Sequence, residues 1–244
     1  MAAHPYKAQA KAEIRLSMTQ YESLLVTFGI PLLFLVAFSL IKVLPLPHGV
    51  LKPVAFLVPG TIALAVMATG MVSLGIATGV ERSYGVLKRL GTTPLSRGAL
   101  LGAKITSVAI IELVQVVLLA AVGFALGWKP AGNALEFVLA IILSSAAFAG
   151  IGLILAGRLK SETVIGAANG LFLLLLVLGG MIFPVTSLPG PIADVARLLP
   201  AYASAHILFV SSTGGGASLA GSWIVLAVWA IVAPLLATRL FRFE

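Results

Sequence analysis

Long apolar runs, separated by short polar connections, dominate the hydrophobic pattern of the chain. A membrane helix needs about 20 consecutive apolar residues to cross the hydrocarbon core, and the chain has several such runs. The pattern predicts six membrane-spanning helices, at residues 23–43, 55–79, 99–127, 135–157, 163–183 and 219–239. The connections are short except for residues 184–218, so we predict one domain over residues 1–244.

The composition agrees with this pattern. Only 10% of the residues are charged, against about 25% in soluble domains, and the mean hydropathy is +1.12. A transmembrane β-barrel would show short alternating strands, which the pattern lacks. The predicted fold class is therefore an all-α polytopic membrane protein.

The N-terminal segment, residues 1–22, alternates apolar and charged positions ahead of the first predicted span. Its apolar run begins too late for a secretory signal. We expect an amphipathic helix at the membrane interface, with apolar residues Ile14, Leu16, Met18 and Tyr21 among charged residues Lys7, Lys11, Glu13 and Arg15.

The distribution of basic residues predicts the orientation. An even number of spans places both termini on one side, and that side holds 12 of the 16 Lys and Arg residues. Because cytoplasmic loops are enriched in Lys and Arg, both termini are predicted to be cytoplasmic. The net charge of +8 is then interpreted as a topology signal and not as a nucleic-acid site.

A basic insert, residues 80–98, connects the second and third predicted spans. As one helix over 80–91 it would place Val80, Tyr84, Leu87 and Leu90 in one apolar stripe. Arg82, Gly85 and Arg89 would lie opposite. Gly91 would end this helix, and Thr93 with Pro94 would begin the next. The insert is either a topology-determining loop on anionic headgroups or a helix that docks on a partner.

Glu112 is the one acidic residue well inside a predicted span, and Gln115 lies on the same helix face. An ionisable group there usually faces a bundle interior or water. One interpretation is a substrate contact or a polar lining of a translocation path. The alternative is an inter-helix hydrogen bond that holds the bundle together.

Small residues are dense in the second and fourth predicted spans. Gly70, Gly75 and Gly79, together with Gly150 and Gly152, predict close helix packing. The long connection at 184–218 contains four prolines before residue 201, which forbid one continuous helix. We predict two short re-entrant helices there, dipping into the outer leaflet without crossing it.

Three motifs in order resemble the permease subunits of the ABC type-2 exporter family over nearly the full length. LVPGTIAL at 57–64 resembles the family's entry into span two, and MIFPVTSLPGPIADVARLLPAYA at 181–203 resembles its Phe-Pro, Leu-Pro and Leu-Pro-x-Tyr series. Between them, the insert resembles the family's pattern of an acidic-basic pair, Gly, Leu, a basic Leu and Thr-Pro-Leu. Its matching residues are Glu81-Arg82, Gly85, Leu87, Arg89-Leu90, Thr93-Pro94-Leu95 and Arg97.

The resemblance implies that the insert is a coupling helix, which docks on a cytoplasmic ABC ATPase. The implied docking residues are Glu81, Arg82, Tyr84, Gly85, Val86, Leu87, Lys88, Arg89 and Leu90. ATP and Mg would be bound by the ATPase subunit, in two copies, and a second permease, identical or homologous, would complete the path. Residues 184–218 would form an external gate-like cap, or otherwise an interfacial anchor. The candidate path residues are Glu112, Gln115, Phe183 and Pro184.

The chain has no chemistry of its own that the pattern can identify. It lacks the G-x-x-x-x-G-K-[ST] phosphate loop and has no cysteine. Its three histidines are scattered, so we expect no metal and no catalytic residue.

The leading hypothesis is therefore a multi-pass permease subunit of an ATP-driven exporter. It would lie in the inner (plasma) membrane, in contact with membrane lipids, and would move an amphipathic or lipid-like substrate or drug outward. An ion-coupled secondary carrier would need buried titratable groups on several spans. A membrane-embedded enzyme would need a nucleophile–base or metal cluster. A non-transporting membrane scaffold stays an alternative.

Overall fold

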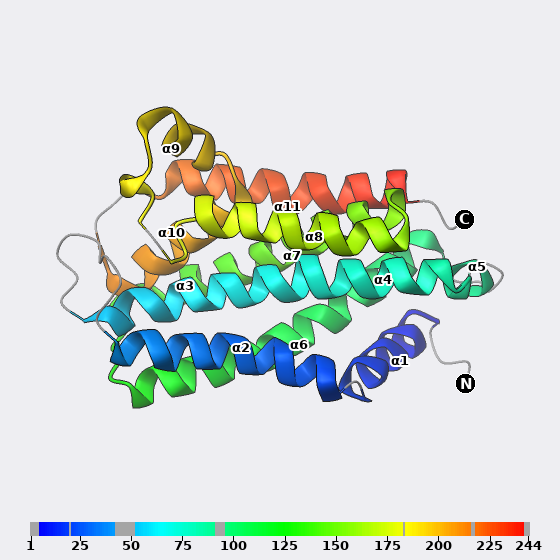
Figure 1. The fold of residues 1–244 in the computed structure, drawn as a ribbon, viewed down its shortest axis with the longest axis horizontal. Helices are drawn as coiled ribbons and strands as arrows, with labels where there is room; N and C mark the ends of the chain where they lie inside the picture. The colour runs from blue at the N-terminus through cyan, green and yellow to red at the C-terminus, as the bar shows by residue number, and fades with distance from the viewer. Residues whose placement is uncertain are drawn as a thin grey trace.

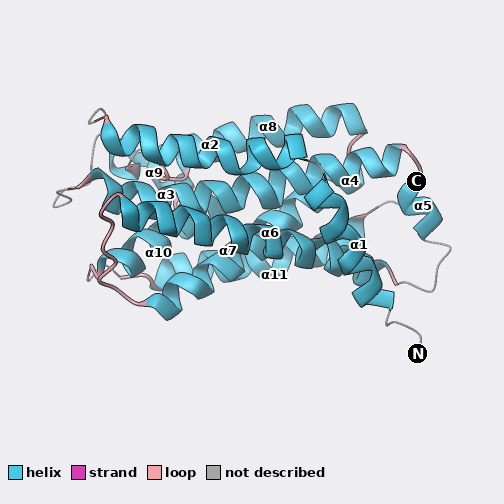
Figure 2. Cartoon of the chain, turned by 90° about the horizontal axis from the view of Figure 1, so that it is seen from below, coloured by secondary structure: helices cyan, strands magenta, loops and turns pink. Residues whose placement is uncertain are grey.

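The computed structural model describes residues 5–19, 21–41, 52–90, 96–182, 184–215 and 218–241. Within these ranges the chain is helical and has no strand (Figure 2). Most helices run along the long axis of the molecule, and α1 is inclined to them (Figure 1).

The helices follow the apolar runs of the sequence. They are α1 (Pro5–Thr19), α2 (Tyr21–Leu40), α3 (Pro53–Met67), the π-helix η1 (Ala68–Ser73), α4 (Leu74–Ser83), α5 (Val86–Leu90), α6 (Arg97–Ala125), α7 (Ala134–Arg158), α8 (Ser161–Leu178), the 3₁₀-helix η2 (Val185–Ser187), α9 (Gly190–Ala196), α10 (Pro200–Thr213) and α11 (Ala220–Leu240).

Five helices in the described part of the chain are long and apolar enough to cross a membrane. They are Pro53–Ser83, Gly98–Ala125, Ala134–Arg158, Ser161–Leu178 and Ala220–Leu240. They correspond to the last five predicted spans, and the protein is a multi-pass membrane protein. The first predicted span, 23–43, corresponds to α2, whose apolar part, Thr27–Leu40, is shorter than the others. Six crossings therefore stay a prediction.

The helix Pro53–Ser83, formed by α3, η1 and α4 without interruption, lies at the centre of the fold. Helices α2, α6, α7 and α10 all pack against α3, and its middle is almost completely buried. At about 1.5 Å per residue it is longer than a hydrocarbon core of about 30 Å. We expect the C-terminal part of α4, which holds Glu81 and Arg82, to extend beyond the apolar layer.

Glycines permit the closest helix contacts, which confirms the predicted packing of the second and fourth spans. A Cβ atom built on Gly75 would lie 3.1 Å from the carbonyl oxygen of Gly152. A Cβ atom on Gly152 would lie 2.6 Å from the carbonyl oxygen of Met71. The backbones of α4 and η1 thus touch the backbone of α7.

The elements between the last two spans lie at one end of the molecule, with α9 at its edge and α10 packed into the bundle (Figure 1). Two short helices, α9 and α10, lie where two were predicted, with α10 beginning at Pro200. Helix α10 is enclosed by α3, α7 and α11. The indole Nε1 of Trp229 in α11 donates to the carbonyl oxygen of Leu198, 3.1 Å away, and so ties the α9–α10 turn to the bundle. The depth of these helices in a membrane stays a prediction.

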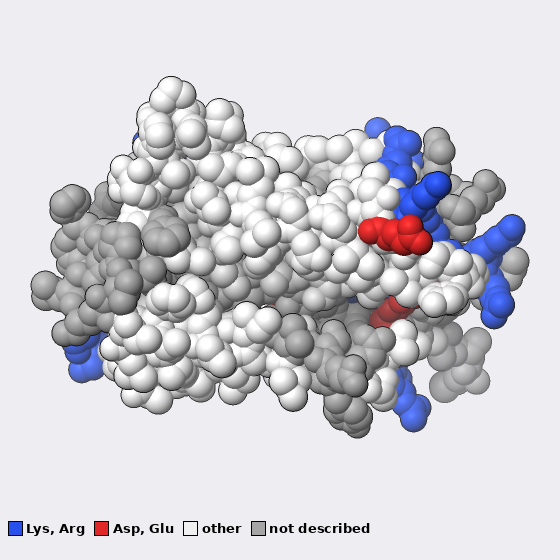
Figure 3. All heavy atoms as spheres, viewed as in Figure 1, with Lys and Arg blue, Asp and Glu red and all other residues white. Residues whose placement is uncertain are grey.

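Helices α1 and α5 and both described ends of the chain lie at the opposite end from α9 (Figure 1). Lysine and arginine side chains gather at that end on the face shown in Figure 3. The elements predicted to be cytoplasmic are therefore together in space.

Candidate functional site

The basic insert is not one helix. Helix α4 continues to Ser83, the chain turns at Tyr84 and Gly85, and α5 follows. Gly85 has a φ of +69°, in the left-handed region that a residue without a Cβ adopts at little cost. The expected continuous helix over 80–91 is therefore wrong, because Gly85 ends α4 instead of lying within a helix.

The break also changes which residues face outward. Leu87 is fully buried, with Leu74, Leu100 and Leu101 in the same apolar cluster. Tyr84, which was expected on the same stripe, is 75% exposed. The predicted apolar stripe is therefore wrong.

The exposed side chains at this end form what we call the α5 surface. It consists of Tyr84, Val86, Lys88 and Arg89, with Gly85 and Leu90 half-buried beside it. Gly91, Thr93 and Pro94, the predicted stop and restart, lie outside the described residues.

The two charged residues before this surface are engaged inside the fold. The guanidinium of Arg82 donates to the carbonyl oxygen of Leu159 at 2.5 Å, which joins α4 to the turn between α7 and α8. Glu81 forms an ion pair with Lys104 of α6, at 2.6 Å from Nζ to Oε2. Neither side chain extends freely to a partner, although both were predicted to dock.

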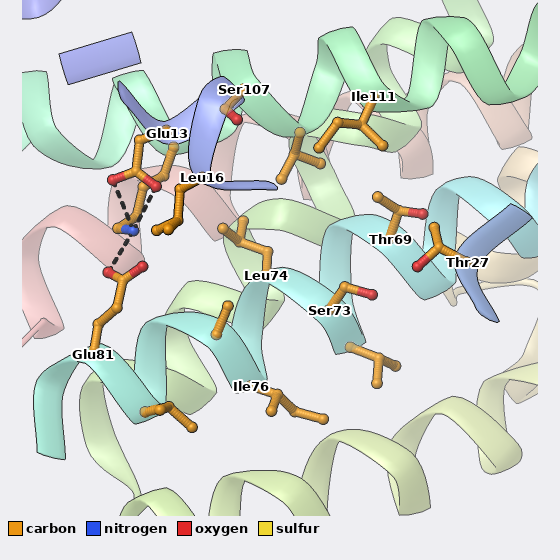
Figure 4. A pocket seen from close by; sticks show the side chains of 15 residues that line it. Glu13, Leu16, Thr27, Thr69, Ser73, Leu74, Ile76, Glu81, Ser107 and Ile111 are labelled. Atoms are coloured by element: carbon orange, nitrogen blue, oxygen red, sulfur yellow. Dashed lines mark hydrogen bonds and ion pairs between the residues drawn. The ribbon is translucent and has the colours of Figure 1, made fainter. Parts of the chain in front are cut away.

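Lys104 joins three helices in one ion cluster, the Lys104 triad, whose partners Glu13 and Glu81 are labelled in Figure 4. Its Nζ lies 2.6 Å from Glu81 in α4, and 2.9 Å and 3.0 Å from the two carboxylate oxygens of Glu13 in α1. Lys104 is only 1% exposed, so its charge depends on these two partners. Gln9 also donates to Glu13, at 2.8 Å.

Sequence reasoning missed this triad because Lys104 was counted only as a basic residue on the cytoplasmic side. A lysine two turns inside an apolar helix is itself a signal, since such a charge requires a partner. The position of Glu13 on α1 could not be matched to it without the inter-helix geometry.

Farther along α6, Gln115 links three elements. Its side-chain oxygen accepts a hydrogen bond from Thr69 of η1 at 3.1 Å, and its Nε2 donates to the carbonyl oxygen of Thr27 in α2 at 2.7 Å. These bonds are the inter-helix interaction considered as the alternative to substrate contact.

Glu112 lies on the same face and is 1% exposed. A Cβ atom on Gly70 would lie 3.1 Å from its Oε1, so its carboxyl group packs against η1. Within the described part of the chain, no hydrogen bond reaches either carboxyl oxygen.

A cavity of about 450 Å³ extends from the Lys104 triad towards Thr69 and Thr27 (Figure 4). Its walls are the facing sides of α1, α2, η1, α4 and α6. The apolar lining residues are Leu16, Val72, Leu74, Ile76, Ala77, Val80, Val108 and Ile111; Ser73 and Ser107 add hydroxyl groups. Glu112 and Gln115 lie on the same helix face but are not among the lining residues.

Of the two remaining path candidates, Phe183 lies outside the described residues. Half-buried Pro184 directly precedes η2 and is not among the residues that line the cavity. In the described ranges, no group of three or more His, Asp or Glu residues is placed to hold a metal ion.

Comparison with known proteins matches residues 42–239 to the model of the ABC-2 family transporter proteins. The chain is also 26% identical over 141 residues to the "Putative transport permease YvfS" of Bacillus subtilis (strain 168). That alignment covers 57% of this chain and 57% of the Bacillus protein.

Proposed function

Since the chain belongs to the ABC-2 transporter family, we propose that this membrane transport permease is the membrane-spanning subunit of an ATP-driven exporter. The observation that carries the proposal is the family match over residues 42–239, on a chain with five long apolar helices. Its partners would be two copies of a cytoplasmic ABC ATPase, which bind ATP and Mg, and a second permease, identical or homologous. The cargo would be amphipathic or lipid-like and would move outward.

We place the protein in the inner (plasma) membrane. In the proposed orientation, both termini and the α5 surface face the cytoplasm. The concentration of basic side chains at that end supports this orientation. The short helix α5 lies beyond the C-terminal end of the central helix Pro53–Ser83. A force applied to α5 would therefore be transmitted directly into the most enclosed helix of the bundle.

The α5 surface exposes one side chain of the kind that is enriched at docking sites, the large and amphipathic Tyr84. Exposed Val86 and Lys88 lie beside it and add an apolar contact and a charge. Leu87, buried beneath them, would hold α5 on the bundle during the ATPase stroke. Docking thus rests on fewer residues than the nine predicted from the sequence.

The test is co-purification of the tagged permease in mild detergent with candidate ABC ATPases from the same source. Tyr84→Asp and Val86→Asp place a charge on the α5 surface without entering the core. Val195→Asp is the matched control, because Val195 is also exposed but lies on α9 at the other end. We expect an ATPase to co-purify with wild type and Val195→Asp, and its yield to fall at least about tenfold with both surface variants.

Leu87→Asp is unsuitable for this test, because its buried position means that a charge would disrupt the fold itself. If no ATPase co-purifies with wild type, the ATP-driven proposal fails, and a carrier or a scaffold becomes the better hypothesis. If Tyr84→Asp and Val86→Asp bind as well as Val195→Asp, the docking role of the α5 surface is refuted.

A further inference from the structure

The cavity beside the Lys104 triad has an unbalanced charge. Three of its described lining residues are charged: the carboxylates of Glu13 and Glu81 and the ammonium group of Lys104. Two negative charges face one positive charge, so the ionised triad has a net charge of −1. The remaining described walls are apolar or carry neutral hydroxyl groups.

This excess charge lies where solvent compensation is weak. The Lys104 side chain is 1% exposed, and those of Glu13 and Glu81 are 12% and 17% exposed. An uncompensated charge in such surroundings is unfavourable unless a counter-charge approaches it. The ammonium group of Lys104 already contacts both carboxylates, so a further counter-charge has to come from outside the triad.

The shape of the cavity indicates what can bring that counter-charge. The charged residues lie at one end, and an apolar passage leads from them towards Thr69 and Thr27 (Figure 4). A volume of about 450 Å³ is within the range of small-molecule sites, about 300–1,000 Å³. A ligand that fits has an apolar body and one cationic group at its end.

We propose that this cavity binds amphipathic molecules with a single positive charge, the cationic group lying against Glu13 and Glu81. Helices α1, α4 and α6 each contribute one charged residue, so the site exists only when α1 is docked on the bundle. The identification of such cations as the cargo rests on the proposed transport function. Their binding to the cavity does not depend on that function.

The experiment measures binding of radiolabelled tetraphenylphosphonium to the purified full-length permease in lipid nanodiscs, with empty nanodiscs subtracted. Radiolabelled tetraphenylborate, of similar size and opposite charge, is measured in separate samples, because the two ions together form an insoluble salt; it separates charge recognition from apolar partitioning. We expect saturable binding of the cation to wild type and no saturable binding of the anion.

Four variants test which residues form the binding site. Glu13→Gln and Glu81→Gln each leave one carboxylate for Lys104 and make the triad neutral, so the affinity for the cation falls about tenfold or more. Ser73→Trp fills the cavity without changing its charge and abolishes binding. Asp194→Asn is the control, because this exposed carboxylate pairs with Arg197 on α9, far from the cavity, and its affinity equals that of wild type.

Lys104→Gln gives a signature that a purely structural role cannot produce. It removes the positive charge of the triad and lowers its net charge, towards −2 to the extent that both carboxylates stay ionised, so the permease that folds binds the cation more tightly than wild type. Thermal unfolding identifies folded preparations; if this variant does not fold, the two glutamine variants decide the question.

The inference is overturned if wild type binds no more cation than empty nanodiscs, if tetraphenylborate in separate samples binds equally well, or if Glu13→Gln and Glu81→Gln bind like wild type. Failure of ATPase co-purification together with intact cation binding would refute the proposed ATP-driven export and leave the binding site standing. ATPase co-purification without cation binding would refute the cation site and leave the proposed ATP-driven export standing.

Discussion

Gly152→Ala tests whether the contact between α7 and the central helix is as close as the structure shows. The added methyl group would lie 2.6 Å from the carbonyl oxygen of Met71 and 2.8 Å from that of Gly70. Favourable carbon contacts begin at about 3.5 Å, so two buried backbones have to separate by several tenths of an ångström. Overpacking of this kind costs about 1–3 kcal/mol.

Gly166→Ala is the matched control for the helix propensity of alanine. Gly166 is also inside a helix, α8, but no atom lies within 4 Å of the position of its added Cβ. Both substitutions gain up to about 1 kcal/mol because alanine favours the helix over glycine. The difference between the two variants therefore isolates the steric cost, about 1–3 kcal/mol, or about five- to 150-fold in the unfolding constant.

The assay is reversible unfolding by SDS in mixed micelles, followed by the fluorescence of the three tryptophans. We expect Gly152→Ala to unfold at a lower SDS fraction than wild type, and Gly166→Ala at the same or a higher fraction. Equal midpoints for the two variants would show that the helices separate without cost, and the close contact would lose its structural importance.

Three further predictions concern single contacts. Gln115→Leu removes its bonds to Thr69 and to α2, which lowers the free energy of unfolding by about 1 kcal/mol in the same SDS assay; an unchanged midpoint would mean that neither bond contributes. Gly85→Ala places a Cβ at a φ of +69° and costs about 1–2 kcal/mol of local strain. We expect faster hydrogen exchange of the α5 amides, and unaltered exchange would contradict the left-handed turn. Trp229→Phe removes the bond to Leu198, so protease cleavage between α9 and α10 becomes faster, and a wild-type cleavage rate would refute this anchoring role.

The apolar runs predict most of the fold because hydrophobic length alone determines which segments can cross a membrane. The glycines of the second and fourth spans also identify a close contact correctly, since few other residues allow backbones to touch. The same kind of argument fails at Gly85. A helical pattern with a glycine on its polar face resembles a continuous helix, although the glycine in fact ends α4.

The candidate site was only partly predictable. Glu112 and Gln115 were identified correctly as buried polar residues, since a carboxyl and an amide group in an apolar run require an enclosed position. Their roles in a path stay predictions. The partnership of Lys104 with Glu13 and Glu81 depends on how α1 lies across α6, and no spacing along the chain encodes that crossing.

The π-helix η1 sets the phase of the helix that follows it. An α-helix advances about 100° per residue, and a π-helical turn contains about one residue more than an α-helical one. The side chains after Ser73 are therefore rotated by about 100° relative to an unbroken helix through Pro53–Ser83. Deleting one residue from Ala68–Ser73 would restore a regular helix and turn Glu81 away from Lys104, without altering either residue. The wide turn in the middle part of the central helix thus determines which face the helix presents about two turns later, at the end that leads into α5.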